Sequence, residues 1–138
     1  MKKLLSIFFI LFFCFPSYGE WTFINEIEGN KYHLDFKNIK TDDKFVYWYL
    51  LSNLDKPSFM IHEESMDQIS IKSHILHYRG DCVEMKTEVL NQKFYEKPMG
   101  EKLFDSYERG GKWEYTVPDT FGFNLLKMVC ILGGKSDK

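Results

Sequence analysis

Apolar and polar residues alternate with a period of two along one stretch of the chain, residues 82–90. The odd-numbered positions are mostly apolar, and the even-numbered positions between them carry charge. One face would hold Val83, Met85, Thr87 and Val89, and the other Glu84, Lys86 and Glu88. A period of two with one polar face predicts a half-buried β-strand that begins at Cys82.

Two regions nearer the N-terminus also have the composition of strands. Residues 45–51 read FVYWYLL and are apolar or aromatic on both faces, which predicts a central strand covered on both sides. Residues 21–27 and 31–36 predict a hairpin, with Glu28, Gly29 and Asn30 supplying its turn.

Two more strands follow in the second half of the chain. Residues 69–78 predict a strand that Gly80 and Asp81 turn back into the segment beginning at Cys82. Residues 101–107 predict a weaker strand, which the glycines at 110 and 111 would end.

The hydrophobic period changes from strand to helix after Pro118. Apolar side chains then recur at helical spacing: Phe121, Leu125, Met128, Val129 and Leu132. Asp119 or Thr120 suits the N-cap, and Gly133 with Gly134 would stop the helix. The pattern therefore predicts an α+β fold, an antiparallel sheet of about five to six strands with one C-terminal helix packed on it.

The first residues have the layout of a secretory signal peptide. Lys2 and Lys3 form a short positive region, and residues 4–15 are apolar apart from one serine. Ser17 and Gly19 place small residues before a cleavage site, so residues 1–19 are predicted to be removed. A membrane anchor is disfavoured because a spanning helix needs about 20 apolar residues.

Cys14 does not support lipidation, because phenylalanines at positions 12 and 13 precede it where a small residue is needed. The sequence thus predicts an exported protein, with the periplasm favoured and the cell surface or secretion left open. We expect residues 20–134 to form a single domain and residues 135–138 to be a flexible C-terminal tail. Contact with the membrane would be limited to the signal peptide.

The predicted mature chain keeps two cysteines, Cys82 and Cys130. An even pair in an oxidising compartment favours a disulfide, which would pin the helix onto the sheet. The chain-entropy relation gives such a bridge about 4 kcal/mol of stabilisation. Metal binding by the two thiols is disfavoured because no CxxC pair or neighbouring histidine completes a four-ligand set.

Charge argues against nucleic acid as a partner. The chain has 18 basic and 20 acidic residues, and losing Lys2 and Lys3 leaves 16 against 20, a net charge of −4. The lysines are scattered among carboxylates instead of forming a basic stripe, which is typical of a mixed, solvated surface.

Motifs for catalysis or metal binding are incomplete. His62 and Glu63 begin a zincin-like pattern, but position 66 is Met66 where the second histidine is required. His74 and His77 would face opposite sides of a strand. His33 and Asp35 share a face but supply two ligands only, and no serine lies in a GxSxG turn. We therefore expect no enzyme activity, no cofactor and no metal site.

A short apolar segment, residues 57–61 with the sequence PSFMI, lies between charged residues on both sides. We interpret it as a long connection in which an apolar cluster with a polar rim forms an interaction site. Phe59, Met60 and Ile61 are the candidate partner-binding residues. In the alternative, Phe59 and Ile61 fold back to cover the open face of the sheet.

Several features occur in a fixed order between residues 20 and 130. They are Trp21, the segment YHLD at 32–35 leading to Ile39, the aromatic strand around Val46 and Trp48, Asp81 beside Cys82, and Pro118 before a helix ending in Met128, Val129 and Cys130. Together they resemble the surface-adhesin protein E family. The resemblance implies a small antiparallel sheet with a C-terminal helix, a disulfide joining Cys82 and Cys130, and export. It also implies binding of host extracellular-matrix proteins.

These observations leave two function classes. The first is an exported, non-enzymatic binding protein whose partner is an extracellular-matrix or envelope protein. The second is a periplasmic carrier of a small apolar ligand held between sheet and helix. The sequence leaves a homodimer open. Without a lipidation cysteine, a periplasmic location is favoured over display at the cell surface.

Overall fold

The computed structural model describes residues 20–135, so the predicted signal peptide and the last three residues lie outside the described part of the chain. The elements in chain order are β1 (Trp21–Ile27), β2 (Asn30–Asp35), η2 (Phe36–Asn38), β3 (Lys40–Thr41), β4 (Val46–Ile61), β5 (Gln68–Asp81), β6 (Lys86–Tyr95), η3 (Pro98–Gly100), β7 (Leu103–Glu108), β8 (Glu114–Tyr115) and α2 (Phe121–Leu132). The prefix η marks a short 3₁₀ helix.

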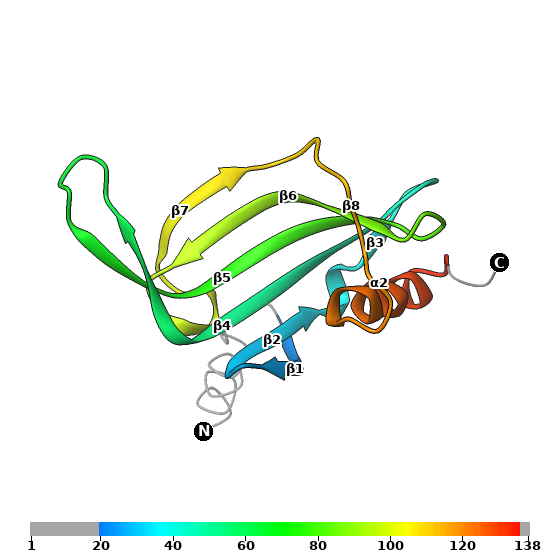
Figure 1. The fold of residues 1–138 in the computed structure, drawn as a ribbon, viewed down its shortest axis with the longest axis horizontal. Coiled ribbons are helices and arrows are strands. Elements are labelled where there is room, and N and C mark those ends of the chain that lie inside the picture. The colour runs from blue at the N-terminus through cyan, green and yellow to red at the C-terminus, as the bar shows by residue number, and fades with distance from the viewer. Residues whose placement is uncertain (1–19, 136–138) are drawn as a thin grey trace, which may run out of the picture.

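The strands form one antiparallel sheet in which neighbours in sequence are mostly neighbours in space (Figure 1). Its order is β1-β2-β4-β5-β6-β7, with β3 paired to β4 and β8 paired to β6, which makes eight strands. The predicted fold class, an antiparallel sheet with one C-terminal helix, is confirmed. The strand count exceeds the prediction because β3 and β8 are only two residues long.

The predicted N-terminal hairpin is confirmed, with Ile27 opposite Asn30. Its turn consists of Glu28 and Gly29, both at positive φ, 52° and 85°. Asn30, which was predicted to belong to the turn, is the first residue of β2. This is the backbone shape that a two-residue turn needs to match the twist of its strands. A Cβ at Gly29 would lie 2.6 Å from the side chain of Asp55, so glycine also allows β4 to pass close to the turn.

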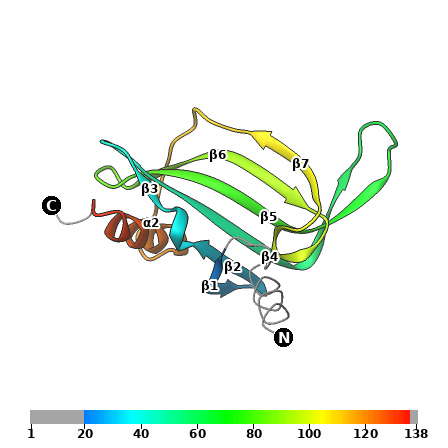
Figure 2. The ribbon, with the colours of Figure 1, turned by 180° about the vertical axis from the view of Figure 1, so that it is seen from behind.

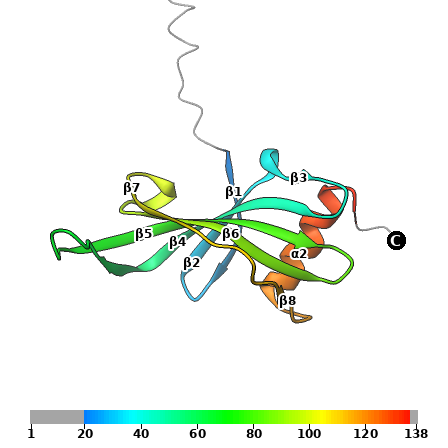
Figure 3. The ribbon, with the colours of Figure 1, turned by 90° about the horizontal axis from the view of Figure 1, so that it is seen from above.

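Helix α2 covers one face of the sheet at one end, and the far end of β4 and β5 projects beyond it (Figure 3). The predicted N-cap is confirmed at Thr120, whose hydroxyl accepts a hydrogen bond from the Phe123 N–H at 3.3 Å. The core beneath the helix consists of buried apolar residues from β2, β4 and α2: Leu34, Val46, Trp48, Leu50, Leu125, Leu126, Val129 and Cys130. Within residues 20–135, no helix has the length and apolar character required to cross a membrane.

Gly80 was predicted to turn the chain, but it lies inside β5 opposite Val46. A Cβ at this position would be 2.5 Å from Leu126 Cδ1 and 2.8 Å from the Trp48 ring. The glycine is therefore a packing residue, because its missing side chain is what lets α2 approach the sheet.

The disulfide between Cys82 and Cys130 is confirmed, with the two Cα atoms 6.0 Å apart. It ties α2 to the turn between β5 and β6. The prediction that a strand begins at Cys82 is wrong, since residues 82–85 form this turn and Val83 is 89% exposed. The Asp81 carboxylate accepts hydrogen bonds from the N–H groups of Val83 and Glu84, both at 2.9 Å, and this local bonding overrides the alternating pattern.

The face of the sheet opposite α2 is only partly covered. Leu51 is buried there beside η3, while Tyr49 on the same face is exposed. The prediction that residues 45–51 are covered on both sides therefore holds at the Leu51 end alone. Seen from behind, the far ends of β4 and β5 extend beyond the other strands and α2 (Figure 2).

Candidate interaction surface

The outer ends of β4 and β5 form a two-stranded hairpin, residues 58–71, that we call the arm (Figure 1). Strand β2 pairs with β4 only as far as Asn53, and β6 pairs with β5 only from Ser73. Beyond these points the two strands pair with each other, from Ser58 opposite Ile71 to Ile61 opposite Gln68. The arm therefore extends past the sheet as a pair of strands with no third strand paired to it among the described residues. At its tip the His62 ring lies edge-on to Phe104 of β7, with ring centres 6.1 Å apart.

A bulge in β4 marks where the arm begins. Asn53 pairs with Ser73 and Ser58 with Ile71, so residues 54–57 of β4 lie opposite Lys72 alone. The bulge is held by the Asp55 N–H, which donates to Asn30 Oδ1 at 2.9 Å. Pro57 is tolerated because a bulged residue need not donate to the ladder.

The prediction that residues 57–61 form a connection is therefore wrong, because they belong to β4. Phe59 and Ile61 lie on one face of the arm and are 60% and 61% exposed. This exposure contradicts the alternative in which both side chains fold back over the sheet. Met60 points to the opposite face, where it is half-buried and pairs with Ile69.

The tip of the arm, residues 62–67, is a compact and acidic loop. Its backbone closes through His62 N–H to the Asp67 carbonyl at 2.9 Å and Met66 N–H to the His62 carbonyl at 2.8 Å. Glu63, Glu64 and Asp67 are all exposed. In the sequence, the carboxylates were treated only as the rim of an apolar cluster. The structure shows that they form the end of a projecting element.

The base of the arm is braced on the open face by η3. The Ser73 hydroxyl donates to the Lys97 carbonyl at 2.6 Å and accepts from the Gly100 N–H at 3.0 Å. Asn53 Oδ1 accepts from the Met99 N–H at 2.7 Å. These bonds fix the connection between β6 and β7 against the root of the arm, which gives the projecting hairpin a firm support.

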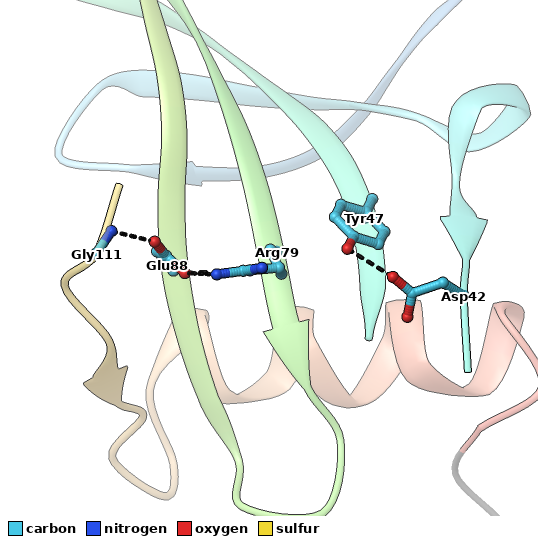
Figure 4. Close-up of polar contacts among 5 residues, drawn as sticks. All are labelled: Asp42, Tyr47, Arg79, Glu88 and Gly111. Atoms are coloured by element: carbon cyan, nitrogen blue, oxygen red, sulfur yellow. Dashed lines mark hydrogen bonds and ion pairs between the residues drawn. The ribbon is translucent and has the colours of Figure 1, made fainter. Parts of the chain in front are cut away.

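A polar cluster occupies the open face at the helix end of the sheet (Figure 4). The Arg79 guanidinium forms an ion pair with Glu88 on the neighbouring strand, and the Gly111 N–H donates to the other Glu88 oxygen. The guanidinium also lies 4.9 Å from the Phe45 ring centre and 4.8 Å from that of Trp113.

Glu88 corrects the sequence interpretation, which placed it on a solvent-facing strand face, because it is 3% exposed. Burial opposes its ionisation, but the hydrogen bonds from Arg79 and Gly111 outweigh burial and lower the pKa of the Glu88 carboxyl. Both charges are thus satisfied by fixed partners. The cluster clamps the chain around Gly111 onto β6.

Asp42 and Tyr47 form a second polar contact nearby, in which the Tyr47 hydroxyl donates to Asp42 Oδ2 at 2.7 Å (Figure 4). Asp42 also accepts from the N–H groups of Phe45 and Lys44 at 2.7 and 2.9 Å. These hydrogen bonds, with that from Phe45 the strongest, lower the pKa of Asp42 to about 2. The contact is a local turn that leads the chain into β4.

The histidines that were considered as ligands are each packed against an aromatic ring. His33 contacts Phe23 with ring centres 5.7 Å apart, His74 stacks on Phe94 at 6.0 Å, and His77 stacks on Tyr49 at 4.2 Å. Burial lowers the pKa of His33, His74 and His77, which keeps these rings neutral near pH 7.

Asp35, paired with His33 in the sequence argument, accepts a hydrogen bond from Asn38 Nδ2 at 2.6 Å. Between residues 20 and 135, no three His, Cys, Asp or Glu side chains come together in a way that would hold a metal ion. His62 and Glu63, the start of the incomplete zincin pattern, lie exposed at the tip of the arm.

An apolar groove of about 520 Å³ lies between β1 and α2. Its lining residues come from both elements: Ile24, Asn25, Ile27, Phe121, Asn124, Leu125 and Met128. Sequence reasoning did not find this groove, because it depends on how far α2 sits from the edge strand. The interface between the helix and the centre of the sheet, by contrast, is filled.

The architecture is that of a small disulfide-closed α+β domain: one antiparallel sheet, one terminal helix and a projecting hairpin. The family model described as surface-adhesin protein E matches residues 21–131. The chain therefore belongs to the surface-adhesin protein E family, which confirms the resemblance seen in the sequence.

Solved structures of protein E from Haemophilus influenzae share this fold. One, crystal form II, has a TM-score of 0.65 at 20% identity and covers 88% of this chain and 93% of that chain. Another, from a non-typeable strain, has a TM-score of 0.61 at 19% identity, with coverage of 91% and 85%. At this identity the likeness shows the fold alone. The comparison with curated protein sequences finds no match.

Proposed function

We propose that this chain is an exported, non-enzymatic binding protein that engages a protein partner through the arm. The observation that carries the proposal is the exposure of Phe59 and Ile61, 60% and 61%, on a projecting hairpin of a surface-adhesin family member. Extracellular-matrix proteins of a host are the partner class that the family suggests. An envelope protein is the alternative partner for a chain that stays in the periplasm.

Physical chemistry supports the arm as the contact surface. Large apolar side chains on a strand are usually buried, because covering each one contributes about 1.5–3 kcal/mol. Phe59 and Ile61 forgo this stabilisation in the isolated chain. A partner that covered them would recover it, and interface energy usually concentrates in a few large side chains of this kind.

Binding to a panel of immobilised matrix proteins tests the proposal. The mature chain, residues 20–138, is passed over fibronectin, laminin and collagen in a surface-plasmon-resonance experiment. We expect at least one of them to bind and the double variant F59S/I61S to weaken that binding by at least about 1 kcal/mol, which is roughly fivefold.

Val83 and Ile131 provide a matched control, because they are exposed apolar residues at the opposite end of the molecule. The double variant V83S/I131S removes a similar apolar area and should leave binding unchanged. Equal losses of binding affinity in both variants would show that binding depends on nonspecific hydrophobic contact and not on the arm. Absence of binding to the whole panel would move the search to envelope proteins.

Export is part of this proposal. We expect the mature chain to begin at Glu20, and N-terminal sequencing of the protein recovered from the envelope fraction tests this. A chain that still begins at Met1 would contradict both the proposed location and the cleavage site.

The groove between β1 and α2 favours a second candidate, a carrier of a small apolar ligand. The filled core excludes a ligand between the helix and the centre of the sheet, so the carrier would have to use this surface groove. Native mass spectrometry of the purified chain tests the idea. A co-purifying lipid-like mass that M128K removes would support the carrier over the adhesin.

A further inference from the structure

Charge is distributed unevenly along the arm. The tip, residues 62–67, carries Glu63, Glu64 and Asp67 and has no lysine or arginine. Lys56 and Lys72 lie at the opposite end, where the arm joins the sheet. An approaching partner therefore meets a concentrated negative charge at the far end of an apolar surface.

The backbone of the arm also has unused hydrogen-bonding capacity. Residues 58–61 and 68–71 pair only with each other, and within residues 20–135 no third strand lies along either outer edge. Such edges accept an extended peptide as an added strand, because every second N–H and C=O points outward. Elsewhere β6 pairs with β5 over residues 73–81, and β3 and β2 pair with β4 over residues 46–47 and 50–53.

We propose that the arm binds an extended segment of its partner in which lysine or arginine stands beside apolar residues, and that this segment adds to the arm as a third strand. The inference rests on the proposed function and specifies the chemistry of the partner. Alternate side chains of an added strand point to one face, so apolar residues at every second position would lie beside Phe59 and Ile61. The basic residues would reach the carboxylates of the tip.

Two synthetic ten-residue peptides test this chemistry, one alternating lysine with valine and one alternating glutamate with valine. Each is titrated into the ¹⁵N-labelled mature chain at low salt. We expect the lysine peptide to shift the amide signals of residues 58–71 and the glutamate peptide to leave them in place. Because exposed charges are screened over about 10 Å at 0.1 M salt, affinity for the lysine peptide should fall severalfold as salt rises.

A matched pair of charge reversals distinguishes an effect of the carboxylates at the tip from an effect of the net charge of the chain. E63K/E64K changes the tip, and E26K/E28K makes the same change in net charge on the exposed N-terminal hairpin. We expect the first variant to weaken binding of the lysine peptide at least about tenfold and the second less than about twofold. F59S/I61S should also weaken it, while the thermal midpoint stays near that of the parent chain.

Equal effects of the two charge reversals, or peptide-induced shifts centred outside residues 58–71, would overturn the inference. Matrix binding that F59S/I61S abolishes, together with no binding of the lysine peptide, would overturn it and leave the proposed function standing. Binding of the lysine peptide at the arm, with no matrix protein bound, would support the inference and contradict the proposed host partner.

Discussion

The two ends of β4 use apolar side chains in opposite ways. At the helix end Val46, Trp48 and Leu50 are buried under α2, whereas at the arm end Phe59 and Ile61 are mostly exposed. Both sets belong to one continuous strand, Val46–Ile61. The difference lies in what covers them: a helix held by a disulfide at one end, and no helix or further strand within residues 20–135 at the other. Stability should therefore concentrate at the helix end and binding at the arm.

Removing the disulfide is the strongest test of the helix end. Cys82 and Cys130 are 48 residues apart, so the chain-entropy relation assigns the bridge about 4 kcal/mol. We expect C82S/C130S to lower the free energy of unfolding by about this amount, measured by chemical denaturation of the oxidised parent and the variant. An unchanged denaturation midpoint would contradict a stabilising role for the bridge.

A cavity under the helix should have the next largest effect. Leu126 is fully buried and contacts the space left open by Gly80, so L126A should destabilise the fold by about 3 kcal/mol. Ile131 on the same helix is exposed, and I131A is the control, with an expected change below about 0.5 kcal/mol. Similar losses for both variants in thermal melts would show that Ile131 is also covered in solution, because alanine raises helix propensity at both positions.

The ion pair between Glu88 and Arg79 should contribute less to the free energy of unfolding than the disulfide or Leu126, because Arg79 remains partly exposed. E88Q should cost about 2 kcal/mol at pH 7, since it removes the charge that Arg79 and Gly111 bind. The pKa of Glu88 is lowered in the folded chain from its ordinary value of 4.5. Its contribution is therefore present above that value and is lost as the pH falls through the folded pKa.

Urea denaturation of the parent and E88Q at pH 7, 5 and 3 measures this dependence. The difference in unfolding free energy should be similar at pH 7 and 5 and should shrink at pH 3. A difference that stays constant across this range would assign the loss to packing and not to charge.

Substitutions in the arm should have the smallest effect on stability. F59S/I61S removes two exposed side chains. We expect it to lower the free energy of unfolding by less than about 1 kcal/mol, mostly because serine has a lower strand propensity. Differential scanning calorimetry measures it. A loss of several kcal/mol would show that both side chains are covered in solution and would remove the contrast between the two ends.

Features that depend on local chemistry could be predicted from the sequence. The turn at Gly29, the Thr120 N-cap and the helical spacing after Pro118 are determined within a few residues, and all three are confirmed. The disulfide followed from cysteine number and compartment, together with the family resemblance. It is confirmed between Cys82 and Cys130.

Features that depend on pairing between distant residues could not be predicted from the sequence. Residues 57–61 were interpreted as a connection, but the bulge opposite Lys72 places Pro57 where no donor is needed, so β4 continues through it. Glu88 looked solvent-facing because its partner, Arg79, lies across the β5–β6 hairpin and is known only once the register is known. For the same reason, no pattern showed that Phe59 and Ile61 would share an exposed face of an arm.

The arm is a continuation of the two central strands and not a loop appended to the sheet's edge. A pull on a bound partner would therefore pass along β4 and β5 into the middle of the molecule. There the ladders that join β4 to β2 and β5 to β6 would carry the load in shear, with their hydrogen bonds sharing it. The far end of β5 leads to Cys82 and its bridge to α2. Under the proposed function, this continuity would place the mechanical anchor of the bound partner in the core.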